Sequence, residues 1–166
     1  TRTFPANGKF SEAQASLYQL VLEAQLGAME LLVPGNNLKQ ATDVAVEIIC
    51  QGLIERGILK GSLEENIENH TWRAYFMHGL GHWLGLNVHD VGMYKIDGED
   101  RPLLPGMVLT VEPGIYIDSD ADVDPKWQGL GIRIEDNIVI TETGHKVLTD
   151  AVPKTISEIE TLMASN

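Results

Sequence analysis

The sequence predicts an α+β fold in which two helices pack on an antiparallel sheet. Residues 12–57 contain two segments whose apolar positions recur at helical spacing along one side. From residue 73 the pattern changes to short β-like runs separated by turn residues. Helices followed by strands indicate separate layers rather than alternating βαβ units. At 166 residues the chain fits one domain with a substantial core.

Sequence signals indicate where both helices begin and end. Ser11 and Gln14 form the S-x-x-Q capping box, in which each side chain satisfies an unpaired backbone amide at a helix start. This helix is predicted over residues 12–32 and ends at the Val-Pro-Gly sequence that follows. Asn37 is the predicted cap of a second helix over residues 38–57, with Gly57 at its end. Their one-sided apolar stripes indicate that both helices cover the sheet.

The strands are predicted in the second half of the chain. The run GMVLTVEPGIYI, residues 106–117, follows a proline, and the run GIRIEDNIVIT, residues 131–141, alternates with a period of two. We therefore expect the second run to be buried on one face only. The apolar face holds Ile132, Ile134, Ile138 and Ile140, and the polar face holds Arg133, Glu135 and Asn137.

Composition excludes several classes of function. The net charge of −12, with only 12 basic residues, argues against a nucleic-acid partner, because phosphate binding needs clustered Lys and Arg. No apolar run approaches the ~18 residues of a membrane span, and the start does not resemble a signal peptide. The single cysteine, Cys50, lies in an apolar run and is expected to be a buried, inert thiol. We therefore expect a cytoplasmic protein with no membrane partner.

One glycine-rich segment, FMHGLGHWLGLNVHDVG at residues 76–92, holds three of the five histidines: His78, His82 and His89. The HGLGH sequence has the spacing of a zincin motif, but Gly79 stands where the catalytic glutamate must be, and the glycines argue against a helix. GLGHWLG also fails as a dinucleotide-binding fingerprint, because Leu84 replaces its last glycine. The acidic run at residues 118–124 lacks the glycine of a calcium loop and is interpreted as a solvated loop.

Two glutamates lie in otherwise apolar strands. Glu112 follows the run Val-Leu-Thr-Val, and Glu135 lies in the isoleucine-rich strand. Carboxylates in such places are costly unless they are paired or bind a metal, although a solvent-facing strand edge would explain either one alone. Together with the histidine cluster they favour a metal site. One or two imidazoles with several carboxylates suit Mn²⁺, with Co²⁺ or Zn²⁺ possible, and carboxylates can bridge two ions in hydrolytic enzymes such as aminopeptidases.

Four segments resemble the metallopeptidases of the pita-bread (creatinase/aminopeptidase) fold, and among them the bacterial Xaa-Pro aminopeptidases, or aminopeptidase P. They are TRTFPANGKFSEAQ, YFMHGLGHWLGLNVHDVG, LLPGMVLTVEPGIYI and GLGIRIEDNIVITETG. The resemblance extends over essentially the whole chain. It implies part of a pita-bread fold, with the helices on a curved antiparallel sheet, and two divalent metal ions.

The resemblance also implies the roles of individual residues. His82 would be the imidazole ligand, Glu112 a terminal carboxylate on the same ion, and Glu135 the carboxylate that bridges both ions. Glu112 would also accept a proton from the attacking water. His89 would stabilise the tetrahedral oxyanion, a role that elsewhere contributes about 10²–10³ in rate.

The pocket for the proline after the scissile bond would be lined by His78, Tyr116 and Arg133, with His78 also counted among the catalytic residues. Each has a plainer interpretation. His78 could be a core histidine with satisfied hydrogen bonds, and Tyr116 could be ordinary packing. Arg133 shares a strand face with Glu135 and could simply pair with it.

The chain departs from the family pattern at two metal ligands. The family uses two aspartates from a hairpin, and the second would lie two residues before TRTFP, upstream of Thr1. Asp90, Asp97 and Asp136 do not occupy matching positions. Because the first residue is not Met, we expect residues 1–166 to be the carboxy-terminal part of a catalytic domain. The amino-terminal domain and the first part of the catalytic domain would be absent, and this part alone would be inactive.

The expected activity of the whole protein is release of an amino-terminal residue from peptides with proline at the second position. One alternative is a prolidase, which cleaves Xaa-Pro dipeptides. Another is a non-catalytic relative that keeps the fold to bind peptides or partner proteins. Sheet surface left exposed by the absent half would favour association with another chain, so a homo-oligomer is expected.

Overall fold

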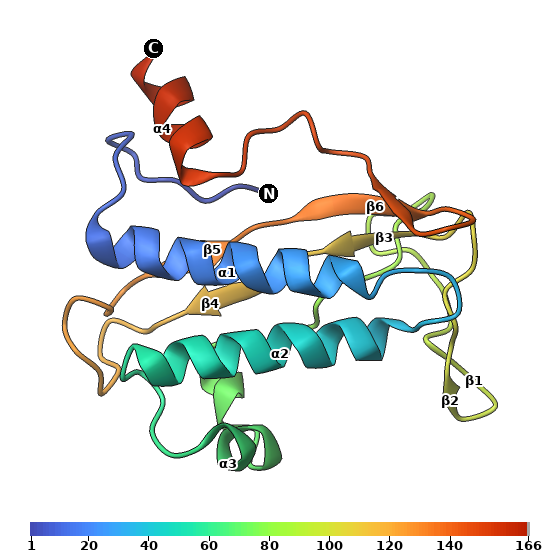
Figure 1. Cartoon of the computed structure of the whole chain (residues 1–166), viewed down its shortest axis with the longest axis horizontal. Helices are drawn as coiled ribbons and strands as arrows, with labels where there is room; N and C mark the ends of the chain where they lie inside the picture. The colour runs from blue at the N-terminus through green and yellow to red at the C-terminus, as the bar shows by residue number, and fades with distance from the viewer. Residues whose placement is uncertain (166) are drawn as a thin grey trace.

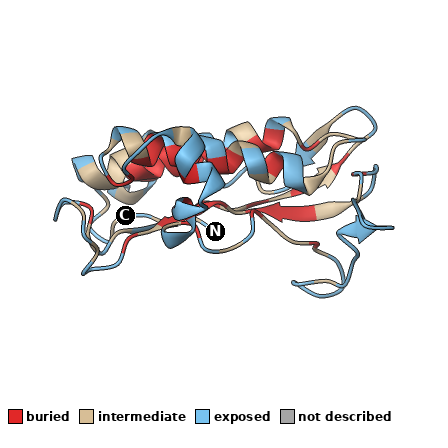
Figure 2. Ribbon diagram, turned by 90° about the horizontal axis from the view of Figure 1, so that it is seen from below, coloured by how far each residue is buried: buried red, intermediate tan, exposed pale blue. Residues whose placement is uncertain are grey.

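Two long helices cover one face of an antiparallel sheet in the computed structural model, which describes residues 1–165 (Figure 1). Helix α1 spans Glu12–Glu30 and α2 spans Leu38–Glu55, and the two pack side by side. Seen from the edge, the helices form one layer and the strands another, with buried residues concentrated between them (Figure 2). The predicted α+β arrangement is therefore confirmed. No helix among residues 1–165 is both long and apolar enough to cross a membrane.

The helix caps follow from local sequence. Both hydrogen bonds of the predicted capping box between Ser11 and Gln14 are present. Asn37 forms a second complete capping box with Gln40. Helix α2 ends at Glu55, two residues before Gly57, which has a φ of +68° and so provides the left-handed residue that closes the helix. Both helices end slightly earlier than predicted.

The two predicted strands are each divided in two. The first forms β3 (Val108–Val111) and β4 (Gly114–Tyr116), and the second forms β5 (Gly131–Arg133) and β6 (Asp136–Ile140). Strand β6 pairs with β3 on one side and with β7 (His145–Val147) on the other, whereas β4 pairs only with β5. Pro113 interrupts the first strand because proline has no amide hydrogen to donate. A short hairpin of β1 (Lys95–Ile96) and β2 (Glu99–Asp100) lies apart from these strands.

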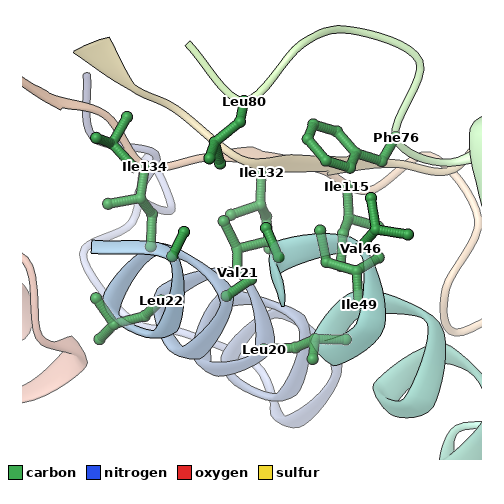
Figure 3. Packing of buried hydrophobic residues seen from close by; sticks show 14 of the residues in the cluster. Leu20, Val21, Leu22, Val46, Ile49, Phe76, Leu80, Ile115, Ile132 and Ile134 are labelled. Atoms are coloured by element: carbon green, nitrogen blue, oxygen red, sulfur yellow. The ribbon is translucent and has the colours of Figure 1, made fainter. Parts of the chain in front are cut away.

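The core lies between the helices and one face of the strands. Ile115, Ile132 and Ile134 point from the strands toward side chains of α1 and α2 (Figure 3). The predicted apolar face is confirmed, since all four of its isoleucines are buried: Ile132, Ile134, Ile138 and Ile140. Residues at the alternate positions of the same strands face away from the helices, and these include the candidate site residues.

Three helical segments lie outside the predicted elements. They are α3 (Leu63–Glu68), the 3₁₀ turn η1 (Thr71–Ala74) and α4 (Ile156–Ala164). Helices α3 and α4 each begin with a complete capping box, of Ser62 with Glu65 and of Thr155 with Glu158. The capping-box pattern that marks a helix start was therefore present in the sequence before both helices.

A buried carboxylate joins both ends of the chain to β6. The Asp136 side chain is fully buried and binds Arg2 and Lys154, each with a nitrogen–oxygen distance of 2.8 Å. Thr149 also donates a hydrogen bond to it, at 2.6 Å. Burial acts to raise the pKa of Asp136, but the hydrogen bonds from Lys154, Thr149 and Arg2 outweigh it and leave the pKa below its ordinary value.

The single cysteine is buried, as predicted. Burial raises the pKa of Cys50 to about 11. A raised pKa makes the thiolate scarce at neutral pH, so the low reactivity expected of this thiol stays a prediction with a physical reason.

Candidate metal centre

Glu112 and Glu135 face each other across the interruption between the paired strands. Val111 pairs with Asp136 before the interruption and Gly114 with Arg133 after it, so the register is the same on both sides. In this register Glu112 lies directly opposite Glu135. Opposed residues of antiparallel strands project to the same face, and here it is the face away from the helices. The two carboxylates are therefore brought together by backbone pairing.

His82 reaches this face from a segment that runs along the other edge of β3. The backbone amides of Thr110 and Glu112 donate to the carbonyls of His82 and Leu80, at 3.0 and 2.7 Å. This segment is not helical, as predicted. Gly81 permits the close approach, because a Cβ atom at this position would lie 1.9 Å from the carbonyl oxygen of Thr110.

His82, Glu112 and Glu135 form a set of metal-ligand type. Their ligand atoms all lie within 4.8 Å of one another, and within residues 1–165 they are the single group of three or more such residues. His82 Nδ1 lies 3.0 Å from the carbonyl oxygen of Trp83, which fixes it as the N–H donor and leaves the Nε2 lone pair free. Nε2 lies 3.3 Å from Glu112 Oε1. One imidazole nitrogen and two carboxylates fit a divalent ion such as Mn²⁺, Co²⁺ or Zn²⁺.

The set is partly withdrawn from solvent. The side chains of His82, Glu112 and Glu135 are 19, 12 and 22% exposed. A fully solvent-facing strand edge therefore does not explain the two glutamates. The hydroxyl of Thr1 donates a hydrogen bond to the Glu135 carboxylate, which places the first residue of the chain beside the group.

A cavity of about 370 Å³ opens in front of the candidate ligands. Its lining includes the exposed His89, whose ring centroid lies 4.4 Å from that of His82. The structure thus gathers all three histidines of the glycine-rich segment at one site. The full lining is His78, Gly79, Gly81, His82, His89, Glu112 and Arg133.

His78, Tyr116 and Arg133 form a hydrogen-bonded chain at this cavity. Arg133 Nε donates to the Tyr116 hydroxyl at 2.7 Å, and the same hydroxyl lies 2.9 Å from His78 Nε2. His78 Nδ1 lies 2.8 Å from the carbonyl of Gly79, so Nδ1 carries the hydrogen and Nε2 accepts from Tyr116. Burial raises the pKa of Tyr116, and its hydrogen bond from Arg133 opposes this only in part. The Tyr116 hydroxyl thus joins Arg133 to His78 by hydrogen bonds.

The alternative pairing of Arg133 with Glu135 is not found among the ion pairs of the described residues. Arg133 Nη1 instead lies 3.7 Å from Glu112 Oε2. In this register Glu112 lies diagonally across the hairpin from Arg133, which is within reach of a long side chain.

Thr110 is a site residue that the sequence analysis does not single out. Its side chain is buried and contacts both His82 and Glu112. The available signal was its position two residues before Glu112, which places both side chains on one face of a strand.

The known proteins that this chain resembles include metallopeptidases, in agreement with a candidate metal site. Residues 1–142 match the model of metallopeptidase family M24. The chain is 60% identical over 98% of its length to the Xaa-Pro aminopeptidase of Haemophilus influenzae, and 53% identical over 99% to that of Escherichia coli. It spans 38% and 37% of these two relatives.

The solved structures that resemble this chain include aminopeptidases. The Pseudomonas aeruginosa aminopeptidase PepP superposes with a TM-score of 0.97 at 51% identity, over 99% of this chain and 37% of that one. A zinc-substituted aminopeptidase P of Escherichia coli in complex with product gives 0.95 at 53% identity, with the same coverage. The fold is therefore part of an aminopeptidase P fold, as the sequence predicts. The chain belongs to metallopeptidase family M24.

Proposed function

We propose that the protein containing this chain is a dinuclear metal aminopeptidase that releases the amino-terminal residue preceding proline. The observation that carries this proposal is the convergence of His82, Glu112 and Glu135. The first two of these residues also line a cavity together with His78 and His89. The names of the most similar relatives support the same substrate class. Residues 1–166 would form the carboxy-terminal part of the catalytic domain.

The proposed roles of the residues are those that the family resemblance implies, and the positions of the side chains are compatible with them. His82 and Glu112 would hold one ion, and Glu135 would bridge to the second. When bound, two divalent ions, Mn²⁺ by preference, supply Lewis acidity and a water whose pKa is lowered toward neutrality. Glu112 would take the proton of the attacking water. His89, beside His82 at the exposed rim, would donate to the developing oxyanion of the substrate.

The chain of His78, Tyr116 and Arg133 would line the subsite for the proline ring. His78 and Arg133 line the cavity, and hydrogen bonds to the Tyr116 hydroxyl link these two side chains, so this part of the wall would be in place before substrate binds. A preformed wall reduces the entropy that binding must remove.

The remaining two ligands would be aspartates supplied just upstream of Thr1. The contact between Thr1 and Glu135 supports this source of ligands. Residues immediately before Thr1 would lie beside the carboxylate of Glu135. Glu135 and those aspartates would then hold the second ion.

The test uses the full-length protein with Mn²⁺. We expect calorimetry to show two ions per chain and peptidase assays to show cleavage of Xaa-Pro-peptides. Glu135→Gln should abolish both high-affinity binding of the second ion and activity. Glu142→Gln, an exposed glutamate just beyond β6, is the matched control and should change neither. Cleavage restricted to Xaa-Pro dipeptides would indicate a prolidase instead. Absence of metal binding and of cleavage by the unsubstituted protein would reject the proposal.

A further inference from the structure

Thr110 contacts both of the candidate ligands of one ion. Its hydroxyl oxygen accepts a hydrogen bond from the backbone amide of His82 at 3.0 Å. The same hydroxyl donates to Glu112 Oε1 at 2.9 Å. The residue is 2% exposed, so solvent does not compete for either bond.

The direction of these two bonds is fixed by chemistry. A backbone amide can only donate, and an ionised carboxylate can only accept. The hydroxyl must therefore accept from His82 and spend its one hydrogen on Glu112. Thr110 also donates its own backbone amide to the carbonyl of His82, at 3.0 Å. The histidine is thus held on both sides of its backbone, and one carboxylate oxygen is held beside its ring.

We propose that Thr110 is a positioning residue, which sets the separation and orientation of His82 and Glu112 before a metal ion binds. The inference rests on the proposed function, because it assigns these two side chains as ligands of one ion. An orienting partner of this kind commonly contributes 10- to 100-fold to metal affinity. The β-branch of threonine adds to the effect, since it restricts the χ1 angle that aims the hydroxyl.

Thr149, which lies just after β7, offers a matched control. Its hydroxyl also accepts from a backbone amide, that of Asn137 at 3.2 Å, and also donates to a carboxylate, that of Asp136 at 2.6 Å. The carboxylate in this case faces the helices and is not a candidate ligand. Replacing each threonine with valine therefore removes the same pair of bonds and keeps the same shape.

The experiment is titration of the full-length protein and its variants with Mn²⁺, followed by the absorption spectrum of the Co²⁺-loaded proteins. Thr110→Val should weaken the tighter Mn²⁺ site about 10- to 100-fold and shift the Co²⁺ bands. Thr149→Val should leave both unchanged. If the valine variant does not fold, a second pair of variants tests the same point. Thr110→Ser keeps the hydroxyl group and Thr110→Ala removes it. Serine should retain most of the affinity and alanine should lose it.

Two results would overturn the assignment. One is Mn²⁺ affinity of Thr110→Val or Thr110→Ala within about threefold of the unsubstituted protein, since that is far below the expected loss. The other is an equal loss in Thr149→Val, which would show a general effect on folding. Failure of the unsubstituted protein to bind Mn²⁺ is a different outcome, and it would overturn the proposed function itself.

Discussion

Replacing Asp136 with asparagine keeps the shape of the side chain but leaves two cations facing a neutral group. The carboxylate is fully buried, and the side chains of Arg2 and Lys154 are 9 and 21% exposed. Removing one partner of a buried ion pair costs about 3–5 kcal/mol, because the remaining charge stays uncompensated. Lys154 keeps some contact with water, so we expect the lower end of this range. At about 3 kcal/mol the free energy of unfolding would lose a large share of a typical 5–15 kcal/mol.

The assay is thermal and urea unfolding of Asp136→Asn beside the unsubstituted protein. For a chain of this size a loss of about 3 kcal/mol corresponds to a fall in Tm of roughly 6–12 °C. The control is Asp43→Asn, which breaks a pair with Lys39 at 2.6 Å whose side chains are 61 and 60% exposed. Such exposed pairs contribute about 0–1 kcal/mol. Equal losses in the two variants would refute the argument that burial sets the cost.

The unsubstituted protein and Asp136→Asn also test how the stabilisation by Asp136 depends on pH. The pKa of Asp136 is lowered in the folded state, so its stabilisation is complete above the unfolded-state value of about 3.9. It is lost as the pH falls through the folded-state value. The stability difference between the unsubstituted protein and Asp136→Asn should therefore be constant near neutral pH and shrink in acid below about pH 4. A difference that persists unchanged into strong acid would contradict the assignment.

Three further predictions concern single positions. Gly81→Ala should destabilise the protein by about 1–3 kcal/mol and weaken Mn²⁺ binding, because the new methyl group meets the Thr110 carbonyl; unfolding and calorimetry measure both effects. Cys50 should not react with a thiol reagent at pH 8 in the folded protein, since burial raises its pKa to about 11, and should react at once in urea. Tyr116→Phe should raise KM for Xaa-Pro-peptides with little change in metal affinity, because it removes the hydrogen bond to His78 at the cavity wall; an unchanged KM would contradict this role.

Local features of the fold could be predicted from the sequence because their physics is local. The predicted capping box at Ser11 and the predicted cap at Asn37 depend only on residues within one helical turn, and both are found. The alternation over residues 131–141 predicts the buried face of β5 and β6. It also places Asp136 on that face, but the partners that make burial tolerable are distant in sequence. Arg2 lies 134 residues away, and no pattern links it to β6.

The residue types of the candidate metal centre were predictable from the sequence, but the strand pairing that brings them together was not. Glu112 and Glu135 stand out because carboxylates in apolar strands require a reason. That they oppose each other depends on strand register, which sequence patterns fix poorly when a strand is interrupted. The spacing of Thr110 and Glu112 indicates a shared strand face, but the contact of Thr110 with His82 depends on the segment of His82 lying along β3, which no sequence pattern indicates.

The continuous register across the interrupted hairpin has a consequence for how this protein tolerates change in length. Residues 118–128 join the two strands of the hairpin beyond their paired residues, so insertions at exposed positions there need alter only the loop. A single residue inserted between Val108 and Glu112 would instead turn every later side chain of that strand to the opposite face. Glu112 would then point at the helices while Glu135 stayed in place. Length variation among natural or engineered versions should therefore collect in the loop and be absent from the strands.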